Sequence, residues 1–222
     1  MSGPLLLVGG AEWQEGCTFD AEAFEAAGRP EVLVLPTAAA YEHPERAVAT
    51  ATAWFAGFGA KAVGLEVLKR PDAEREDLSA QVAAARFIYL GGGSPLHLRS
   101  VLKDSAVWRA LVSAWEGGAT VAGSSAGAMA LTDPMVDPRG GAFTLGLGLI
   151  APLAVVPHYS GWSEDKTRRT MELAPKNVPI LAVDERTAAI RDPDGTWRAT
   201  GVGRVQVFLN GAETPLSEVR VG

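Results

Sequence analysis

The chain of 222 residues contains one cysteine and three histidines. A single cysteine, Cys17, excludes an intramolecular disulfide and suits the reducing conditions of the cytoplasm, where we expect the protein to reside. We interpret Cys17 as a structural residue. Because cysteine and histidine form no cluster with metal-ligand spacing, we expect neither a metal nor an organic cofactor.

Basic runs and long apolar runs are also missing. The net charge is −6, so we expect no nucleic-acid partner and no binding to an anionic membrane surface. No apolar stretch approaches the length of a membrane span, and the first residues lack the basic region of a signal peptide. The sequence leaves a homodimer open.

Strand and helix patterns alternate through the first two-thirds of the chain. Short apolar runs predict strands at Leu5–Val8, Glu31–Leu35, Ala62–Leu68, Arg86–Leu90 and Ala119–Ala122. Helices are predicted at Asp20–Ala27, with Asp20 as its cap, and at Pro44–Phe58, Asp77–Ala85, Leu96–Leu102 and Ala106–Trp115. Repeated β-α-β units indicate an α/β fold with a mostly parallel sheet flanked by helices.

The last third of the chain has short strand patterns separated by turn residues. The predicted strands are Leu153–Val156, Ile180–Val183, Ala188–Arg191, Trp197–Thr200 and Arg204–Leu209. We expect these strands to form hairpins at one edge of the sheet. Since no linker, repeat or low-complexity segment interrupts the chain, we predict a single domain over residues 1–222.

The stretch Thr120–Ala128 has the pattern of a nucleophile elbow. An apolar run enters the turn Gly-Ser-Ser-Ala-Gly, and an alanine-rich run leaves it. Gly123 and Gly127 lack a Cβ, so a strand and a helix can approach closely there. The turn would lift the Ser125 hydroxyl out and leave the Ala126 N–H free to stabilise an oxyanion.

A serine nucleophile needs a base and an acid that orients the base. Of the three histidines, His158 follows an apolar strand, and strand ends of α/β sheets face the ligand crevice. His158 is therefore the predicted base. Asp184 and Glu185 also follow a strand and are the candidate acids. Asp133 and Asp137 are alternatives, although each precedes a proline, as a turn residue would.

A triple glycine, Gly91–Gly93, ends the strand before the elbow strand. We expect its backbone N–H groups to form the second half of an oxyanion hole. Because Pro95 has no N–H, the donor must be Gly92, Gly93 or Ser94.

Four blocks of sequence together resemble the serine peptidases of the dipeptidase E and cyanophycinase type. The blocks are Ile88–Gly93, Gly123–Ala128, Pro157–Ser160 and Val183–Ala188, with additional likeness at Val32–Ala38 and Gly146–Leu149. The resemblance implies a flavodoxin-like, class I glutamine amidotransferase-like fold. It also implies that Ser125 is the nucleophile, His158 the base and Glu185 the acid, with Ala126, Gly92 and Gly93 at the oxyanion hole. An amidotransferase would carry cysteine where Ser125 stands.

The chain departs from the family pattern at Ser94-Pro95 and in the segment after His158. Family side chains at the Ser94 position border the substrate, so Ser94 is a candidate substrate-binding residue. Arg168 and Arg169 are candidate partners of an acidic substrate side chain, because a guanidinium pairs well with a carboxylate.

We therefore predict a serine hydrolase that cleaves a peptide or isopeptide bond of a small peptide, with an Asp-containing dipeptide as the expected substrate. Two alternatives remain from the sequence. One is an esterase or amidase on a different α/β fold, for which Asp133 or Asp137 would be the acid. The other is an inactive, amidotransferase-like binding module that kept its elbow.

Overall fold

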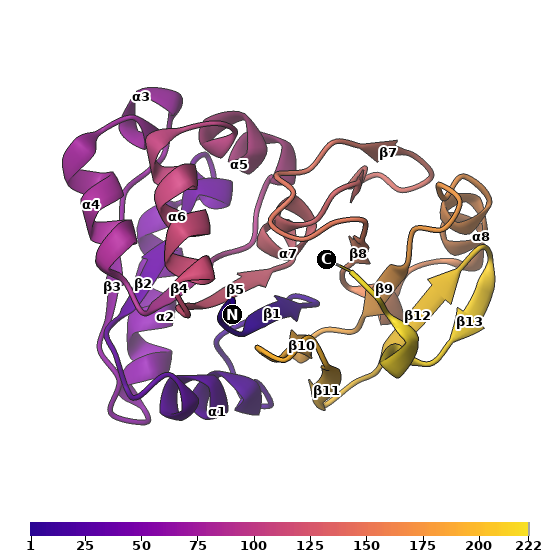
Figure 1. The fold of residues 1–222 in the computed structure, drawn as a ribbon, viewed down its shortest axis with the longest axis horizontal. Coiled ribbons are helices and arrows are strands. Elements are labelled where there is room, and N and C mark those ends of the chain that lie inside the picture. The colour runs from indigo at the N-terminus through magenta and orange to yellow at the C-terminus, as the bar shows by residue number, and fades with distance from the viewer. Residues whose placement is uncertain (222) are drawn as a thin grey trace.

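A seven-stranded sheet forms the centre of the computed structural model, which describes residues 1–221 (Figure 1). Its strand order is β11-β10-β1-β5-β4-β2-β3. The parallel strands are β1 (Leu5–Val8), β5 (Thr120–Ser124), β4 (Phe87–Leu90), β2 (Val32–Leu35) and β3 (Ala62–Gly64). A hairpin of β10 (Thr187–Arg191) and β11 (Trp197–Gly201) joins β1 in antiparallel direction.

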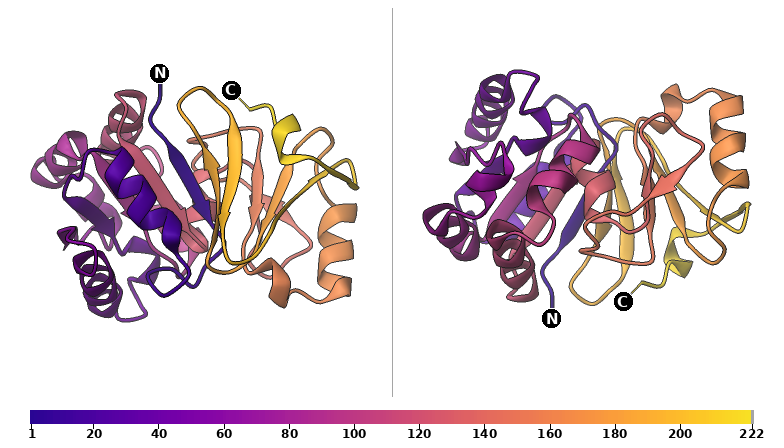
Figure 2. Two further views of the ribbon diagram at one scale, coloured as in Figure 1. Left: turned by 90° about the horizontal axis from the view of Figure 1, so that it is seen from below. Right: turned by 90° about the horizontal axis from the view of Figure 1, so that it is seen from above.

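Helices cover both faces of this sheet, because its apolar strands have two faces to bury (Figure 2). One face carries α1 (Thr18–Ala26) and α2 (Pro44–Ala56). The other carries α3 (Arg70–Ala73), α4 (Glu76–Ala84), α5 (Pro95–Leu102), α6 (Ala106–Glu116) and α7 (Ala126–Leu131). Strand β1 serves both cores through its alternation: Leu5 and Leu7 join one, Leu6 and Val8 the other.

A second sheet of four strands packs beside the first, in the order β13-β12-β9-β8. Its strands are β8 (Ala154–Val156), β9 (Ile180–Val183), β12 (Val205–Leu209) and β13 (Ala212–Thr214). Strands β8 and β9 are parallel, and α8 (Glu164–Glu172) lies in the crossover between them. Two short strands, β6 (Met135–Val136) and β7 (Phe143–Thr144), pair separately, and 3-10 turns occur at Thr37–Ala39, Tyr159–Gly161 and Leu216–Glu218.

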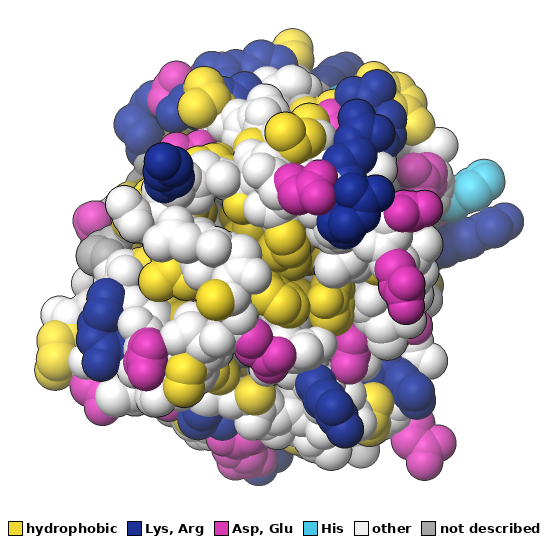
Figure 3. Space-filling view, turned by 90° about the vertical axis from the view of Figure 1, so that its right-hand side faces the viewer, with side chains coloured by type: hydrophobic (Ala, Val, Ile, Leu, Met, Phe, Trp, Pro, Cys, Tyr) yellow, Lys and Arg dark blue, Asp and Glu magenta, His cyan; other side chains and the backbone are white. Residues whose placement is uncertain are grey.

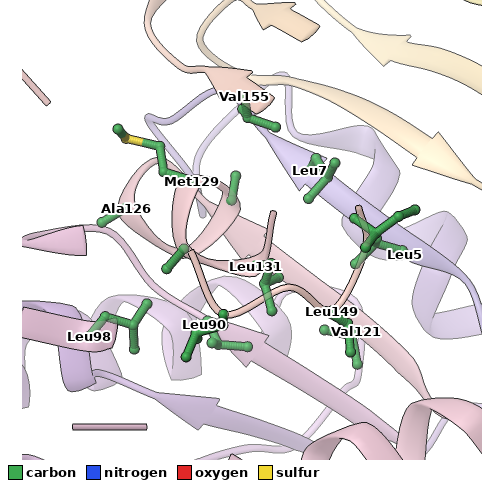
Figure 4. Close-up of a cluster of buried hydrophobic side chains, with 14 of the residues drawn as sticks. Leu5, Leu7, Leu90, Leu98, Val121, Ala126, Met129, Leu131, Leu149 and Val155 are labelled. Carbon is green, nitrogen blue, oxygen red and sulfur yellow. The ribbon is translucent and has the colours of Figure 1, made fainter. Parts of the chain in front are cut away.

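The two sheets share one apolar core. Val155 of the second sheet belongs to the same buried cluster as Leu7 of β1 and Met129 of α7 (Figure 4). This shared core holds the carboxyl end of β5 close to the ends of β8 and β9.

The α/β class, the largely parallel sheet and the C-terminal hairpins agree with the sequence prediction. The prediction was wrong in placing every late strand at one edge of that sheet, since only β10 and β11 lie there. It was also wrong about Asp20, which is buried in α1 and accepts a hydrogen bond from Trp54 Nε1 at 2.9 Å. The third strand ends at Gly64, short of the expected Leu68, and an irregular segment leads from there to α3.

Acidic and basic side chains are interspersed around exposed apolar ones on the molecular face shown in Figure 3. Within residues 1–221, no helix is both long and apolar enough to cross a membrane.

Candidate active site

The carboxyl ends of three adjacent parallel strands meet at one place. Strand β5 lies between β1 and β4, and it delivers Ser125. Strand β1 is followed by Gly9–Glu12, and β4 by Gly91–Gly93. Ligands of open α/β sheets bind at such strand ends, so these three loops define a candidate site.

The turn after β5 has the geometry of a nucleophile elbow. Ser125 adopts a φ of +49°, which is strained for a residue with a side chain and is typical of functional sites. A Cβ on Gly127 would lie 2.3 Å from the Leu90 carbonyl oxygen, and one on Gly123 would lie 2.7 Å from the Gly127 carbonyl carbon. Only glycines permit this approach of strand and helix. Buried Met129 and Leu131 anchor the helix that follows (Figure 4).

Ser125, His158 and Glu185 lie in hydrogen-bonding sequence. The Ser125 hydroxyl donates to His158 Nε2 at 2.8 Å, and His158 Nδ1 lies 2.8 Å from Glu185 Oε1. His158 follows β8 and Glu185 follows β9, which are neighbouring parallel strands. A hydroxyl, an imidazole and a carboxylate in this order form the arrangement of a serine hydrolase.

The other candidate acids lie elsewhere. Asp184 Oδ2 accepts the Arg204 N–H at 2.9 Å, and Asp133 Oδ1 accepts the Gly146 N–H at 2.8 Å. Arg139 forms hydrogen bonds with Asp137 and lowers the pKa of that carboxyl to about 2. Each of these carboxylates is engaged with a partner other than His158, which leaves Glu185 as the carboxylate beside the His158 ring.

The remaining histidines are outside the site. His43 pairs with Glu45 in a mostly exposed position, and His97 Nε2 lies 2.9 Å from the Leu68 carbonyl oxygen. His158 is thus the histidine that the fold brings to Ser125.

The predicted oxyanion donors differ in their availability. The Gly92 N–H donates to Glu12 Oε1 at 2.9 Å, and the Ser94 N–H donates to the Ala38 carbonyl at 2.8 Å. The N–H groups of Gly93 and Ala126 have no acceptor within residues 1–221. Among the donors expected from sequence, this placement favours Gly93 and Ala126 over Gly92.

A pocket of about 290 Å³ opens beside the Ser125 hydroxyl. Its walls include Gly93, Pro95, Ser125, Ala126, Met129, Pro138, Pro157, His158, Gly161, Trp162 and Lys166. Both free N–H groups therefore belong to residues of this pocket.

Lys166 is the basic residue of the pocket wall. Its Nζ lies 3.7 Å from the centroid of the Trp162 ring, in cation–π geometry. Partial burial lowers the pKa of Lys166, because the charged form loses hydration. Lys166 was not predicted from the sequence, although it lies in the first turn of the helix that follows His158 and carries the required charge.

Three predicted substrate-binding residues do not line the pocket. Arg168 forms ion pairs with Asp165 and Glu172 on its own helix, and Arg169 packs near Gly141. Ser94 caps α5 by accepting the His97 N–H at 3.2 Å. The structure therefore brings neither arginine to Ser125.

Residues 1–221 contain no group of three or more histidine, cysteine, aspartate or glutamate side chains that could hold a metal ion. Cys17 is buried just before α1, and this burial raises the pKa of its thiol. The chemistry that the site offers is that of Ser125 and its two partners.

Comparison with known proteins identifies the wider class. A model of Peptidase family S51 matches residues 5–196. The chain therefore belongs to Peptidase family S51, a family of serine-type peptidases. This agrees with the resemblance found in the sequence.

Individual relatives agree with this assignment. A cyanophycinase of Nostoc sp. (strain PCC 7120) is 27% identical over 230 residues, which cover 98% of this chain and 77% of that protein. A cyanophycinase of Synechococcus elongatus is 28% identical over 150 residues, but the match spans only 46% of that protein and 62% of this chain. The chain thus matches less than half the length of the Synechococcus protein.

Solved structures resemble the chain over most of its length. A peptidase from an acI-B1 Actinobacterium has a TM-score of 0.86 and 27% sequence identity, covering 100% of this chain and 96% of that one. A putative Peptidase E protein from Listeria monocytogenes has a TM-score of 0.69 and 16% identity, covering 91% and 100%. The second likeness concerns the fold alone.

Proposed function

We propose that the chain hydrolyses a peptide or isopeptide bond of a small acidic peptide through an acyl-enzyme on Ser125. Ser125 Oγ attacks the carbonyl carbon while His158 Nε2 accepts the hydroxyl proton. His158 then returns that proton to the leaving amine. A water molecule, deprotonated by His158, attacks the acyl carbon and releases the acid and Ser125.

The observation that carries this proposal is the unbroken Ser125–His158–Glu185 sequence, with both contacts at 2.8 Å. Glu185 accepts from Nδ1–H, so Nε2 is free to act as the base. The free N–H groups of Gly93 and Ala126 provide two donors for the oxyanion of the tetrahedral intermediate.

Pocket size and charge favour a small acidic substrate. A volume of about 290 Å³ is close to the lower limit for pockets that hold small ligands. A substrate carboxylate that leaves water needs a cationic partner, and Lys166 offers one in the pocket wall. The relatives named cyanophycinase favour an isopeptide bond, whereas a dipeptidase E-like specificity favours an Asp-X peptide bond.

A panel of dipeptides tests the substrate. We expect the wild-type protein to hydrolyse Asp-Leu or β-Asp-Leu with a higher kcat/KM than Ala-Leu, and Ser125→Ala to hydrolyse none of them. Lys166→Met should reduce the preference for the acidic peptide by about tenfold or more, as expected for a lost charged contact. Arg168→Met is the matched control on the same helix. Equal rates for all three peptides in wild type would exclude an acidic substrate.

A fluorophosphonate probe separates an enzyme from an inactive binding module, because it reacts with activated serines. The proposal requires stoichiometric modification at Ser125. A folded wild-type protein that resists modification would favour the binding module. The esterase on another α/β fold loses its basis, since the chain belongs to Peptidase family S51 and Asp133 and Asp137 lie away from His158.

A further inference from the structure

We propose that Glu12 is a positioning residue, which fastens the triple-glycine loop to the nucleophile elbow and thereby directs the Gly93 N–H toward the oxyanion. This inference rests on the proposed function, since it concerns the donors that serve Ser125. No local sequence pattern around Glu12 predicts such a role.

The two carboxylate oxygens of Glu12 join the two halves of the site. Oε1 accepts the Gly92 N–H at 2.9 Å, and Oε2 accepts the Ser124 hydroxyl at 2.8 Å. Ser124 directly precedes the nucleophile and is fully buried. Gly92 directly precedes the residue with the free N–H. The Glu12 side chain thus connects the residue before the nucleophile with the residue before the proposed oxyanion donor.

The position of Glu12 is itself fixed. It follows Gly9 and Gly10, which leave β1, the strand that pairs with β5. The next residue, Trp13, is buried against Tyr89 of β4, with ring centroids 5.2 Å apart. The backbone around Glu12 is therefore held by β1 and β4, and its side chain connects the ends of β4 and β5.

A loop of three glycines needs such a restraint. Glycine has more backbone freedom than any other residue, so the peptide plane that carries the Gly93 N–H can rotate. Backbone hydrogen bonds hold the residues on either side of this plane: the Gly91 N–H donates to the Leu35 carbonyl, and the Ser94 N–H donates to the Ala38 carbonyl. The Glu12 contact fixes Gly92, the residue whose carbonyl belongs to the Gly93 peptide unit.

Charge argues for a positioning role over a direct one. A carboxylate repels the developing oxyanion, so the negative charge of Glu12 contributes nothing favourable to that oxygen. Glu12 also does not line the pocket beside Ser125. What the site uses is a pair of acceptor atoms at a fixed separation, and a glutamine amide retains one acceptor for Gly92 and a donor that can reach Ser124.

The rate of Ser125 modification by a fluorophosphonate measures the effect without knowledge of the peptide substrate. We expect Glu12→Ala to slow this reaction by about 10²-fold, the size of effect seen when an oxyanion donor is lost or displaced. Glu12→Gln should restore most of the loss. Ser124→Ala should slow the reaction less, and the double variant Glu12→Ala/Ser124→Ala no more than Glu12→Ala alone, because both changes break one network.

Glu15→Ala is the matched control, since Glu15 is an exposed acid on the same loop. The melting temperature of every variant is measured alongside. If Glu12→Ala does not fold, Glu12→Gln and Ser124→Ala replace it in the test. The inference then requires Ser124→Ala to react more slowly than wild type and Glu12→Gln to react at nearly the wild-type rate. An unchanged or faster reaction in folded Glu12→Ala overturns the inference, as does a loss that glutamine fails to rescue. Absence of modification in wild type would instead overturn the proposed function.

Discussion

The two sheets of the molecule contribute different parts of one site. The seven-stranded sheet is covered by helices on both faces, and its parallel strands end in the elbow and the two glycine loops. The four-stranded sheet is thinner and partly exposed along β12 and β13, and it supplies His158 and Glu185. Ser125 and His158, the proposed nucleophile and base, thus follow strands of two separately hydrogen-bonded sheets, and contact between the sheets brings them together.

Besides the shared apolar core, Gly9 and Gly10 at the end of β1 join the two sheets through backbone hydrogen bonds. The Gly9 carbonyl accepts the His158 N–H at 2.7 Å, and the Gly10 carbonyl accepts the Arg186 N–H at 2.8 Å. The backbone that leaves β1 therefore holds His158 itself and Arg186, the residue after Glu185. Substitutions can therefore test the part of the site on each sheet, and the junction between the sheets, one at a time.

The largest effect on turnover should come from the loss of Ser125, which the first sheet supplies. Ser125→Ala should lower kcat/KM by about 10³-fold or more, because without the nucleophile only binding and oxyanion stabilisation remain. Thermal unfolding should change little, since the alanine keeps the backbone of the turn. A variant that retained a tenth of the wild-type rate would show that another residue is the nucleophile.

The second sheet's contribution is tested by Glu185→Gln. The amide cannot hold an imidazolium as a carboxylate does, so we expect a loss in kcat of about 10²-fold or more. Asp184→Asn is the neighbouring control, and it should affect stability more than turnover, because Asp184 accepts a backbone N–H from Arg204. Equal losses of turnover in the two variants would contradict the assignment of Glu185 as the orienting acid.

The junction is tested by Gly10→Ala. A Cβ on Gly10 would lie 2.1 Å from His158 Cε1, so the imidazole must move. We expect kcat to fall by about 10²-fold, as for a displacement of about 1 Å. Gly28→Ala is the control, because Gly28 also has a positive φ, of +82°, but has open space around its Cβ position. Both variants should lose stability, and only Gly10→Ala should lose activity.

The smallest effect on activity concerns Asp20 of α1, a helix that covers the first sheet. Complete burial raises the pKa of Asp20 to about 8, whereas an unfolded aspartate titrates near its ordinary value of 3.8. The folded state therefore holds a proton that the unfolded state has lost between these values. Stability from this group is complete below about pH 4 and declines by about 1.4 kcal/mol per pH unit until pH 8.

Asp20→Asn should remove this dependence, since its amide oxygen still accepts from Trp54 and carries no proton to lose. The melting temperature of Asp20→Asn should rise relative to wild type as the pH increases from 5 to 8. Activity measured at one pH should stay within about twofold, as expected for a substitution away from the site. A constant difference in melting temperature across this range would contradict a neutral Asp20.

Much of this arrangement is predictable from sequence where local chemistry decides it. The elbow residues Gly123 and Gly127 are dictated by a strand and a helix that meet closely, and the alternation of apolar runs predicts the parallel sheet. Ser125, His158 and Glu185 are the chemistry-bearing residues at strand ends, and the structure brings these three together.

The features of the site that depend on contacts between distant parts of the chain were not predictable from the sequence. Glu12 is 80 residues from Gly92 and 112 from Ser124, so no local pattern connects them. Arg168 and Lys166 both follow His158 on α8, and only the rotation of that helix decides which one lines the pocket. The late strands were predicted, but their separate sheet was not, because the sequence of a short strand does not indicate which sheet it joins.

The crossover from β8 to β9 begins at His158 and ends at Ile180, the first residue of β9, and it carries Trp162 and Lys166 of the pocket wall. The register of two parallel strands fixes the two ends of the crossover, whereas the helix between them is held by packing and by the hydrogen bond from the Gly141 N–H to Thr170 Oγ1. Natural variation or laboratory redesign can therefore change what the pocket admits by exchanging the segment after His158, while Ser125, His158 and Glu185, the proposed catalytic residues, keep their places on the strand ends.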